Sequence, residues 1–183
     1  MKKRCNWANN NELEKIYHDT EWGIPVHDDQ TLFEFLILES MQAGLSWSTI
    51  LAKRTTLTEA YDNFDYNQIS KYSDSKIEEL LNNPGVIRNK LKVKSAISNA
   101  KAFLKIQEEF GSFDSFIWNF VSGKTINNHW DTIEDVPAST ELSDKISKEL
   151  KERGFKFLGT TSVYAFMQSI GLVNDHMDYC FRK

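Results

Sequence analysis

Residues 151–161, KERGFKFLGTT, form a short apolar segment with a glycine near each end, between two stretches of helical spacing. Residues 142–153 repeat apolar side chains every four positions, which predicts a helix that Gly154 ends. Residues 163–170 carry a second apolar stripe at helical spacing. The segment therefore predicts two helices joined by a tight glycine hairpin.

The remaining sequence extends this all-α interpretation. Residues 32–39, LFEFLILE, are apolar on almost every side and predict a buried helix. Strand-like alternation is hard to find, and its best case, residues 124–126, is predicted to be a loop. Without repeats, linkers or a visible boundary, residues 1–183 are expected to form one domain of two helical lobes, with the helix-hairpin-helix near 142–170.

Composition narrows the class of protein. The 183 residues are 40% hydrophobic, 26% charged and 13% aromatic, which is typical of a globular protein and excludes disorder. The net charge of −4 argues mildly against a strong non-specific nucleic-acid binder, although an acidic protein can carry a local basic face. The apolar runs are too short for a membrane span, and no signal peptide is found, so a cytoplasmic protein without membrane contact is expected.

The two ends of the chain each carry a cysteine and a histidine. Cys5 and His18 lie near the N-terminus, and His176 and Cys180 near the C-terminus. The second pair is four residues apart, so on a helix both side chains leave one face. Two thiolates and two imidazoles suit one structural Zn²⁺ without an open position. The alternative is that the cysteines are buried apolar residues and the histidines ordinary ones. The other histidines are expected to be solvated loop residues, His27 and His129.

Glu39 lies on the apolar stripe of the buried helix. A carboxylate in that position is paired, neutral or next to a cavity, unless it reaches solvent at the helix end. Trp7, Tyr17 and Trp47 are either core aromatics or, with Glu39, the walls of a pocket for a flat, electron-poor ring.

The hairpin lies among basic residues, which favours phosphate binding on exposed backbone amides. Either Thr160 or Thr161 is expected to cap the second helix. The basic residues are Lys145, Lys148, Lys151, Arg153 and Lys156. Alone this signal is weak, because many helix pairs turn on a glycine.

Together these motifs resemble the DNA-3-methyladenine glycosylase I family of the helix-hairpin-helix DNA glycosylase superfamily. The resemblance covers essentially the whole chain and departs at residues 9–14, which lack the Asp-Pro and the first tyrosine typical of the family. The matching motifs are CNW at 5–7, YHD at 17–19, EWGIP at 21–25, LE at 38–39, QAGLSW at 42–47, RGFKFLGTT at 153–161 and GLVNDH at 171–176.

The resemblance implies a helix-hairpin-helix glycosylase fold with a zinc site built from the four Cys and His residues. It also implies a monofunctional enzyme without lyase activity, which flips 3-methyladenine out of double-stranded DNA, hydrolyses its N-glycosidic bond and releases the free base. Glu39 and Tyr17 are the expected catalytic residues, and Trp7 and Trp47 are expected to stack on the base. The expected DNA contacts are Gln42, Gly44, Leu45, Gly154, Lys156, Gly159 and Thr160.

Two other classes compete with this interpretation. A non-catalytic DNA-binding module would use the hairpin alone, and a zinc hydrolase would need an open metal position, which four protein ligands do not leave. Asp175 is a conceivable catalyst, but orienting the neighbouring zinc ligand or capping a helix is its expected role. The protein is expected to be a monomer.

Overall fold

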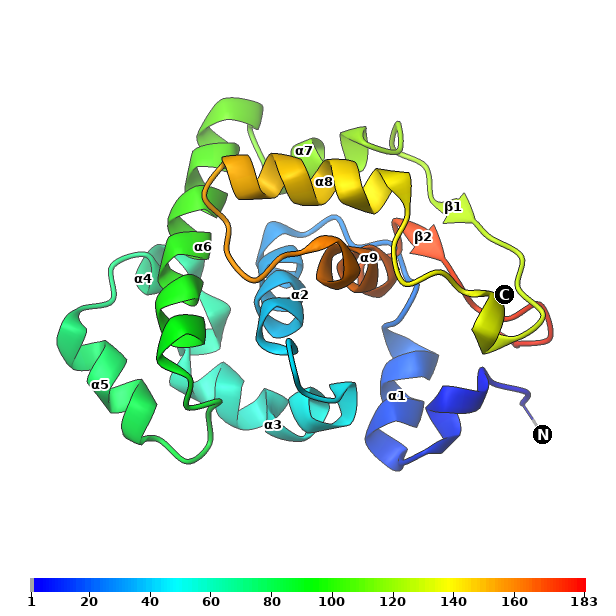
Figure 1. Cartoon of the computed structure of the whole chain (residues 1–183), viewed down its shortest axis with the longest axis horizontal. Helices are drawn as coiled ribbons and strands as arrows, with labels where there is room; N and C mark the ends of the chain where they lie inside the picture. The colour runs from blue at the N-terminus through cyan, green and yellow to red at the C-terminus, as the bar shows by residue number, and fades with distance from the viewer. Residues whose placement is uncertain (1) are drawn as a thin grey trace.

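The computed structural model describes residues 2–183, most of which lie in helices (Figure 1). The α-helices are α1 Glu12–Thr20, α2 Asp29–Met41, α3 Trp47–Ala60, α4 Tyr66–Ile69, α5 Asp74–Asn82, α6 Lys90–Phe110, α7 Phe113–Asn119, α8 Glu141–Glu152 and α9 Thr160–Ser169. Short 3₁₀ helices are η1 Asn6–Asn9, η2 Asp62–Phe64 and η3 Ile133–Asp135. Within residues 2–183, none of the helices combines the length and apolarity needed to cross a bilayer.

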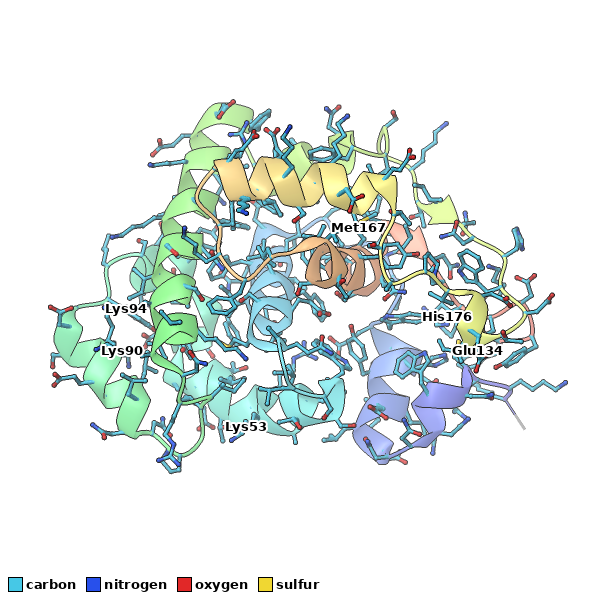
Figure 2. The ribbon with its side chains drawn as sticks, viewed as in Figure 1. Lys53, Lys90, Lys94, Glu134, Met167 and His176 are labelled. Carbon is cyan, nitrogen blue, oxygen red and sulfur yellow. The ribbon has the colours of Figure 1, made fainter. Side chains whose placement is uncertain are left out.

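Helices α2 and α9 lie side by side in the middle of the molecule, with α6, α7 and α8 packed around them (Figure 1). Nearly all side chains of α2 are buried, as expected for a helix that is apolar on every side. The apolar stripe of α9, Val163, Phe166 and Met167, is fully buried together with Ile170, which follows the helix, and Met167 lies near the centre of Figure 2. The buried apolar side chains form one continuous cluster, which holds the pocket walls in place.

Most helices begin at a polar residue whose side chain accepts a hydrogen bond from a first-turn amide. These residues are Asn11, Asp28, Ser46, Asp65, Ser73, Asn89, Ser112 and Thr140. Helix α9 begins at Gly159 without a side-chain cap, so the expectation that Thr160 or Thr161 caps it is wrong. The Thr160 hydroxyl instead lies 2.7 Å from the Ser143 hydroxyl of α8.

Besides helices, residues 2–183 contain one short two-stranded sheet. Strand β1 (Ile126–Asn127) pairs in parallel with β2 (Val173–Asn174), so the prediction of a loop at residues 124–126 is wrong at Ile126. Each strand has only two residues, which is too few for alternation to be recognised in sequence. The Phe181 amide also donates to the Lys3 carbonyl at 2.9 Å. Both termini therefore lie at one end of the molecule (Figure 1).

Candidate functional site

A cavity of about 300 Å³ lies between α1, α2, the start of α3 and α9. The structure places all four expected pocket residues on its wall, together with several that the sequence did not single out for it. The lining residues are Trp7, Glu14, Tyr17, Trp22, Glu39, Gln42, Trp47, Ile133, Val136, Ala165 and Gln168.

Glu39 lies on this cavity and is only 3% exposed, so the alternative that it reaches solvent is wrong. The Ser169 hydroxyl lies 3.4 Å from its Oε1, but the same hydroxyl is 3.0 Å from the Ala165 carbonyl and has one proton to share. Oε2 is buried and has no hydrogen-bond partner among residues 2–183. Burial raises the pKa of Glu39 to about 8. The cavity thus contains a carboxyl group whose acceptor capacity is largely unused.

Aromatic rings form much of the cavity wall. The Tyr17 and Trp47 ring centroids are 5.3 Å apart, and those of Trp7 and Trp22 are 5.0 Å apart with an edge-to-face angle of 79°. Burial, helped by the nearby Glu39, raises the pKa of Tyr17 well above its ordinary range, so its phenol remains neutral. This wall can contact a flat ring on its faces and attract a positive charge.

The sequence analysis assigned no role to six of the lining residues, Glu14, Trp22, Ile133, Val136, Ala165 and Gln168. Glu14 precedes Tyr17 by three residues, so helical spacing placed both side chains on the same face of α1. Ile133 and Val136 come from η3 and the residue after it, within a segment of no regular pattern. Only the packing of that segment over the cavity identifies them.

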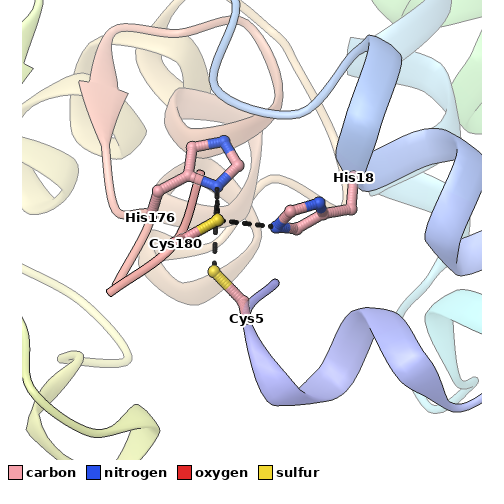
Figure 3. A group of neighbouring side chains, drawn as sticks. All are labelled: Cys5, His18, His176 and Cys180. Atoms are coloured by element: carbon pink, nitrogen blue, oxygen red, sulfur yellow. Dashed lines mark hydrogen bonds between the residues drawn. The ribbon is translucent and has the colours of Figure 1, made fainter. Parts of the chain in front are cut away.

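Cys5, His18, His176 and Cys180 form a buried cluster at the end of the molecule where the termini meet (Figure 3). Their four donor atoms all lie within 4.8 Å of one another. Cys180 Sγ is 3.4 Å from His18 Nε2 and 3.5 Å from His176 Nδ1, and Cys5 Sγ is 3.7 Å from His176 Nδ1. Zinc–sulfur and zinc–nitrogen bonds at tetrahedral angles separate such atoms by about 3.6 Å. The donor set therefore fits a tetrahedral metal ion.

The second nitrogen of each imidazole has its own partner. His18 Nδ1 lies 2.8 Å from Asp19 Oδ1, and Arg4 forms an ion pair with the same carboxylate. His176 Nε2 lies 3.0 Å from the Trp22 carbonyl. Such outer contacts orient metal-binding imidazoles in known sites. Because Trp22 lines the cavity, the cluster also supports the pocket wall.

His176 and Cys180 do not lie on a helix, contrary to the sequence interpretation. They lie in the irregular segment that follows β2, where the Cys180 amide donates to the Met177 carbonyl at 2.8 Å. Gly23 allows the close approach of this segment to the loop after α1. Its φ is +78°, and a Cβ there would lie 3.0 Å from His176 Nε2.

The carboxylate of Asp175 is buried and accepts four hydrogen bonds. Tyr164 donates at 2.5 Å, Asn128 at 2.7 Å, Gln168 at 2.8 Å and Trp130 at 2.9 Å. The expected roles in orienting the next residue or capping a helix are wrong, because the carboxylate binds only side-chain donors of α9 and of the loop after β1. Asp175 joins these two segments, and through Gln168 it fixes one side of the cavity.

The turn after α2 is held by a buried lysine that the sequence did not single out. Lys92 of α6 donates to the Met41 carbonyl at 2.8 Å and to the Ala43 carbonyl at 2.7 Å. Burial lowers the pKa of Lys92. Beyond this anchor, Gly44 has a φ of +78° and Leu45 is exposed at the tip, as expected for a turn with an apolar end. Residues 42–45 and the first turn of α9 border a second hollow.

The hairpin between α8 and α9 presents fewer free groups than its sequence indicates. Gly154 has a φ of +99°, and the Phe155 amide donates to the Leu150 carbonyl, so the helix ends as expected. The Lys156 amide donates to Asn99 Oδ1 at 2.8 Å, so it is not free to bind a phosphate. The exposed lysine side chains and the uncapped amides after Gly159 remain available to a ligand.

Arg153 is also engaged, since its guanidinium pairs with Glu109 at 2.7 Å and with Glu149 at 2.9 Å. Its charge is therefore largely balanced within the protein. His27 and His129 are exposed as expected, and they lie against Asp114 and Asp178.

A family model, sequence relatives and solved structures all indicate the same protein family. A family model described as methyladenine glycosylase matches residues 7–183. The DNA-3-methyladenine glycosylase of Haemophilus influenzae is 45% identical over 180 residues, 98% of this chain and 97% of that protein. DNA-3-methyladenine glycosylase 1 of Escherichia coli is 42% identical over 178 residues, 97% of this chain and 95% of that protein. A solved structure of 3-methyladenine DNA glycosylase I from Staphylococcus aureus, described as the basis of 3-methyladenine recognition, has a TM-score of 0.95 at 33% identity, covering 98% of this chain and 96% of that one.

Proposed function

The chain belongs to the methyladenine glycosylase family, and we propose that it removes 3-methyladenine from alkylated double-stranded DNA. The reaction is hydrolysis of the bond between the base and C1′ of the deoxyribose. The names of the curated relatives support this substrate. The observation that carries the proposal is the cavity that combines aromatic walls with the buried carboxyl group of Glu39.

The cavity suits a cationic base. Methylation at N3 gives adenine a positive charge, which Trp7 and Trp47 would attract by stacking. Glu39 would accept a hydrogen bond from the amino edge of the base and balance its charge. A neutral adenine lacks the electrostatic part of this stabilisation, so it would be held less well. Tyr17 would contact the base or the sugar through its hydroxyl group.

The charge on the base also determines the chemistry. The N-glycosidic bond breaks with its electron pair moving to the ring, so the base departs neutral without receiving a proton. Water adds at C1′ and loses a proton to solvent. No strong general acid is required, and the protein mainly flips, holds and orients the nucleotide. None of the residues that the structure identifies on the cavity is a lysine, which supports a monofunctional enzyme without a Schiff-base step.

DNA would be bound by two neighbouring segments. The turn that contains Gln42, Gly44 and Leu45 borders the cavity and would fill the gap left by the flipped nucleotide. The hairpin residues Gly154 to Thr160, with the Lys156 side chain and the first amides of α9, would bind a phosphate as a helix-hairpin-helix. The adjacency of the turn to the first turn of α9 supports a shared DNA face.

Zinc is the metal that the Cys₂His₂ cluster fits. Cys5 and Cys180 would bind as thiolates, His18 through Nε2 and His176 through Nδ1. With four protein ligands the ion has a structural role, joining the ends of a single domain that spans residues 1–183. We propose that the enzyme is a monomer and that it acts in the cytoplasm, the compartment that contains the DNA in the bacteria of its relatives.

Chromatography of the bases released from methylated duplex DNA tests the function. We expect the wild-type protein to release 3-methyladenine and leave 7-methylguanine in place, and Glu39→Gln to reduce release strongly. A folded, metal-loaded wild-type protein that binds DNA but releases no base would reject the enzyme in favour of a binding module.

A further inference from the structure

Glu14 is a second acidic side chain on the cavity, and the chemistry above gives it no role. It lies on α1, on the same face as Tyr17, and is only 7% exposed. It lines the same cavity as Glu39, although the two come from different helices. A buried carboxylate beside a pocket needs either protein partners or an occupant that supplies them.

The protein satisfies only one of the two Glu14 oxygens. The Ser48 hydroxyl donates to Oε1 at 2.6 Å, and the Asn11 side chain donates to the Ser48 oxygen at 3.0 Å. Oε2 is buried and lacks a hydrogen-bond partner throughout the described part of the chain. Leaving such an acceptor unpaired is unfavourable. Because Glu14 lines the cavity, a molecule bound there is the candidate donor.

A third buried polar atom belongs to the same wall. Trp47 Nε1 is a donor and also has no partner within residues 2–183. The residues that line the cavity therefore carry two acceptor oxygens without partners, on Glu14 and Glu39, and one donor without a partner, on Trp47. An alkylated aminopurine complements this set, because its amino group has two N–H donors and its ring nitrogens are acceptors.

We infer that Glu14 is a specificity-determining residue that accepts a hydrogen bond from the bound base and favours its cationic form. The inference rests on the proposed function, since it assigns the base that the enzyme removes to this oxygen. With two carboxylates beside the base, the preference for binding a charged ring over a neutral ring is larger than with Glu39 alone. The alternative role is a purely structural link between α1 and α3 through Ser48.

Glu14→Gln separates the two roles, because it keeps an oxygen that Ser48 can bind and removes the carboxylate. The matched control is Glu12→Gln, an exposed glutamate on the same helix. The first measurement is kcat/KM for release of 3-methyladenine from methylated DNA. The second is the ratio of affinities for free 3-methyladenine and adenine, by tryptophan fluorescence in mildly acidic buffer, where the methylated base is a cation.

We expect Glu14→Gln to lower kcat/KM and the affinity ratio about tenfold each, the scale of one charge-assisted hydrogen bond. Glu12→Gln should behave as the wild type. An unchanged affinity ratio in a folded Glu14→Gln protein would overturn the inference in favour of the structural link.

Crystals of the wild-type protein soaked with 3-methyladenine provide a test that needs no variant. A base nitrogen within about 3.2 Å of Glu14 Oε2 supports the inference, and a base that leaves this oxygen without contact rejects it. If the wild-type protein releases no base, the proposed function is rejected. The affinity ratio and the soaked crystals would still show whether Glu14 contacts a bound base.

Discussion

Glu39 is buried in the central helix, and that burial decides its protonation state in the empty pocket. Its pKa rises from an ordinary value near 4.5 to about 8 because the charged form loses its hydration. The group is therefore mostly protonated at neutral pH. A cationic base beside it favours the ionised form, so base binding and proton release are coupled.

Replacing Glu39 by Gln removes this titration and changes how stability depends on pH. Because the folded pKa exceeds the unfolded one, the contribution of Glu39 to wild-type stability is fully present below pH 4.5 and is lost as the pH rises to about 8. Glu39→Gln should gain about 5 kcal/mol relative to the wild type across this range. Urea unfolding at a series of pH values measures the difference, with Glu12→Gln as the exposed control. A difference that does not change with pH would contradict the shifted pKa.

At the scale of elements, the turn after α2 depends on a side chain from another helix. The ammonium group of Lys92 binds the Met41 and Ala43 carbonyls, which the helix end leaves without intrahelical donors. A cation is also favoured at a helix C-terminus by the helix dipole. Residues 42–45 are thus held at the mouth of the cavity by α6, which lies about fifty positions later in the chain.

Lys92→Met should leave both carbonyls without a charged donor and release the turn. We expect the free energy of unfolding to fall by about 1–3 kcal/mol, and kcat/KM for base release to fall about tenfold or more because the turn loses its position. Lys94→Met is the control, since Lys94 is an exposed residue of the same helix, at the end of the molecule away from His176 (Figure 2). Equal base release by both variants would show that Lys92 does not position the turn.

At the scale of the whole molecule, contacts between the chain ends complete the fold. The Cys and His cluster and the bond from the Phe181 amide to the Lys3 carbonyl join the two ends, and the β1–β2 pair fixes the C-terminal segment to residues 126–127. Trp7 lies between this cluster and the cavity, with its ring 5.4 Å from that of His18. A metal ion at the cluster would therefore stabilise the pocket wall as well as the termini.

Metal analysis of the purified protein should give one zinc per chain, and chelation should lower the unfolding midpoint by roughly 10 °C. This follows from about 4 kcal/mol of stabilisation by an ion present far above its dissociation constant. Cys180→Ser should reduce the zinc content, and His27→Ala, at an exposed position outside the cluster, should not. A protein purified without chelator that contains far less than one zinc per chain would disprove the metal site.

The sequence by itself determined the features that depend on neighbouring residues. The helices around the hairpin, the end of α8 at Gly154 and the all-round burial of α2 follow from local spacing and backbone preference. The same spacing placed Glu39 on the apolar stripe of α2, and the structure decided that it is buried rather than exposed at the helix end. The Cys and His residues were recognised from their chemistry, and the structure brings them together.

Tertiary structure alone decided the features that depend on partners distant in the chain. His176 and Cys180 lie outside any helix, in the segment after β2, and the two-residue pairing of β2 with β1 is an interaction that no local pattern reveals. The Lys92 anchor, the engagement of Arg153 and the free Glu14 oxygen likewise depend on which segments meet. Local propensity acts over one or two helical turns, whereas a pocket is formed by long-range packing, so its unpaired atoms are visible only in the folded chain.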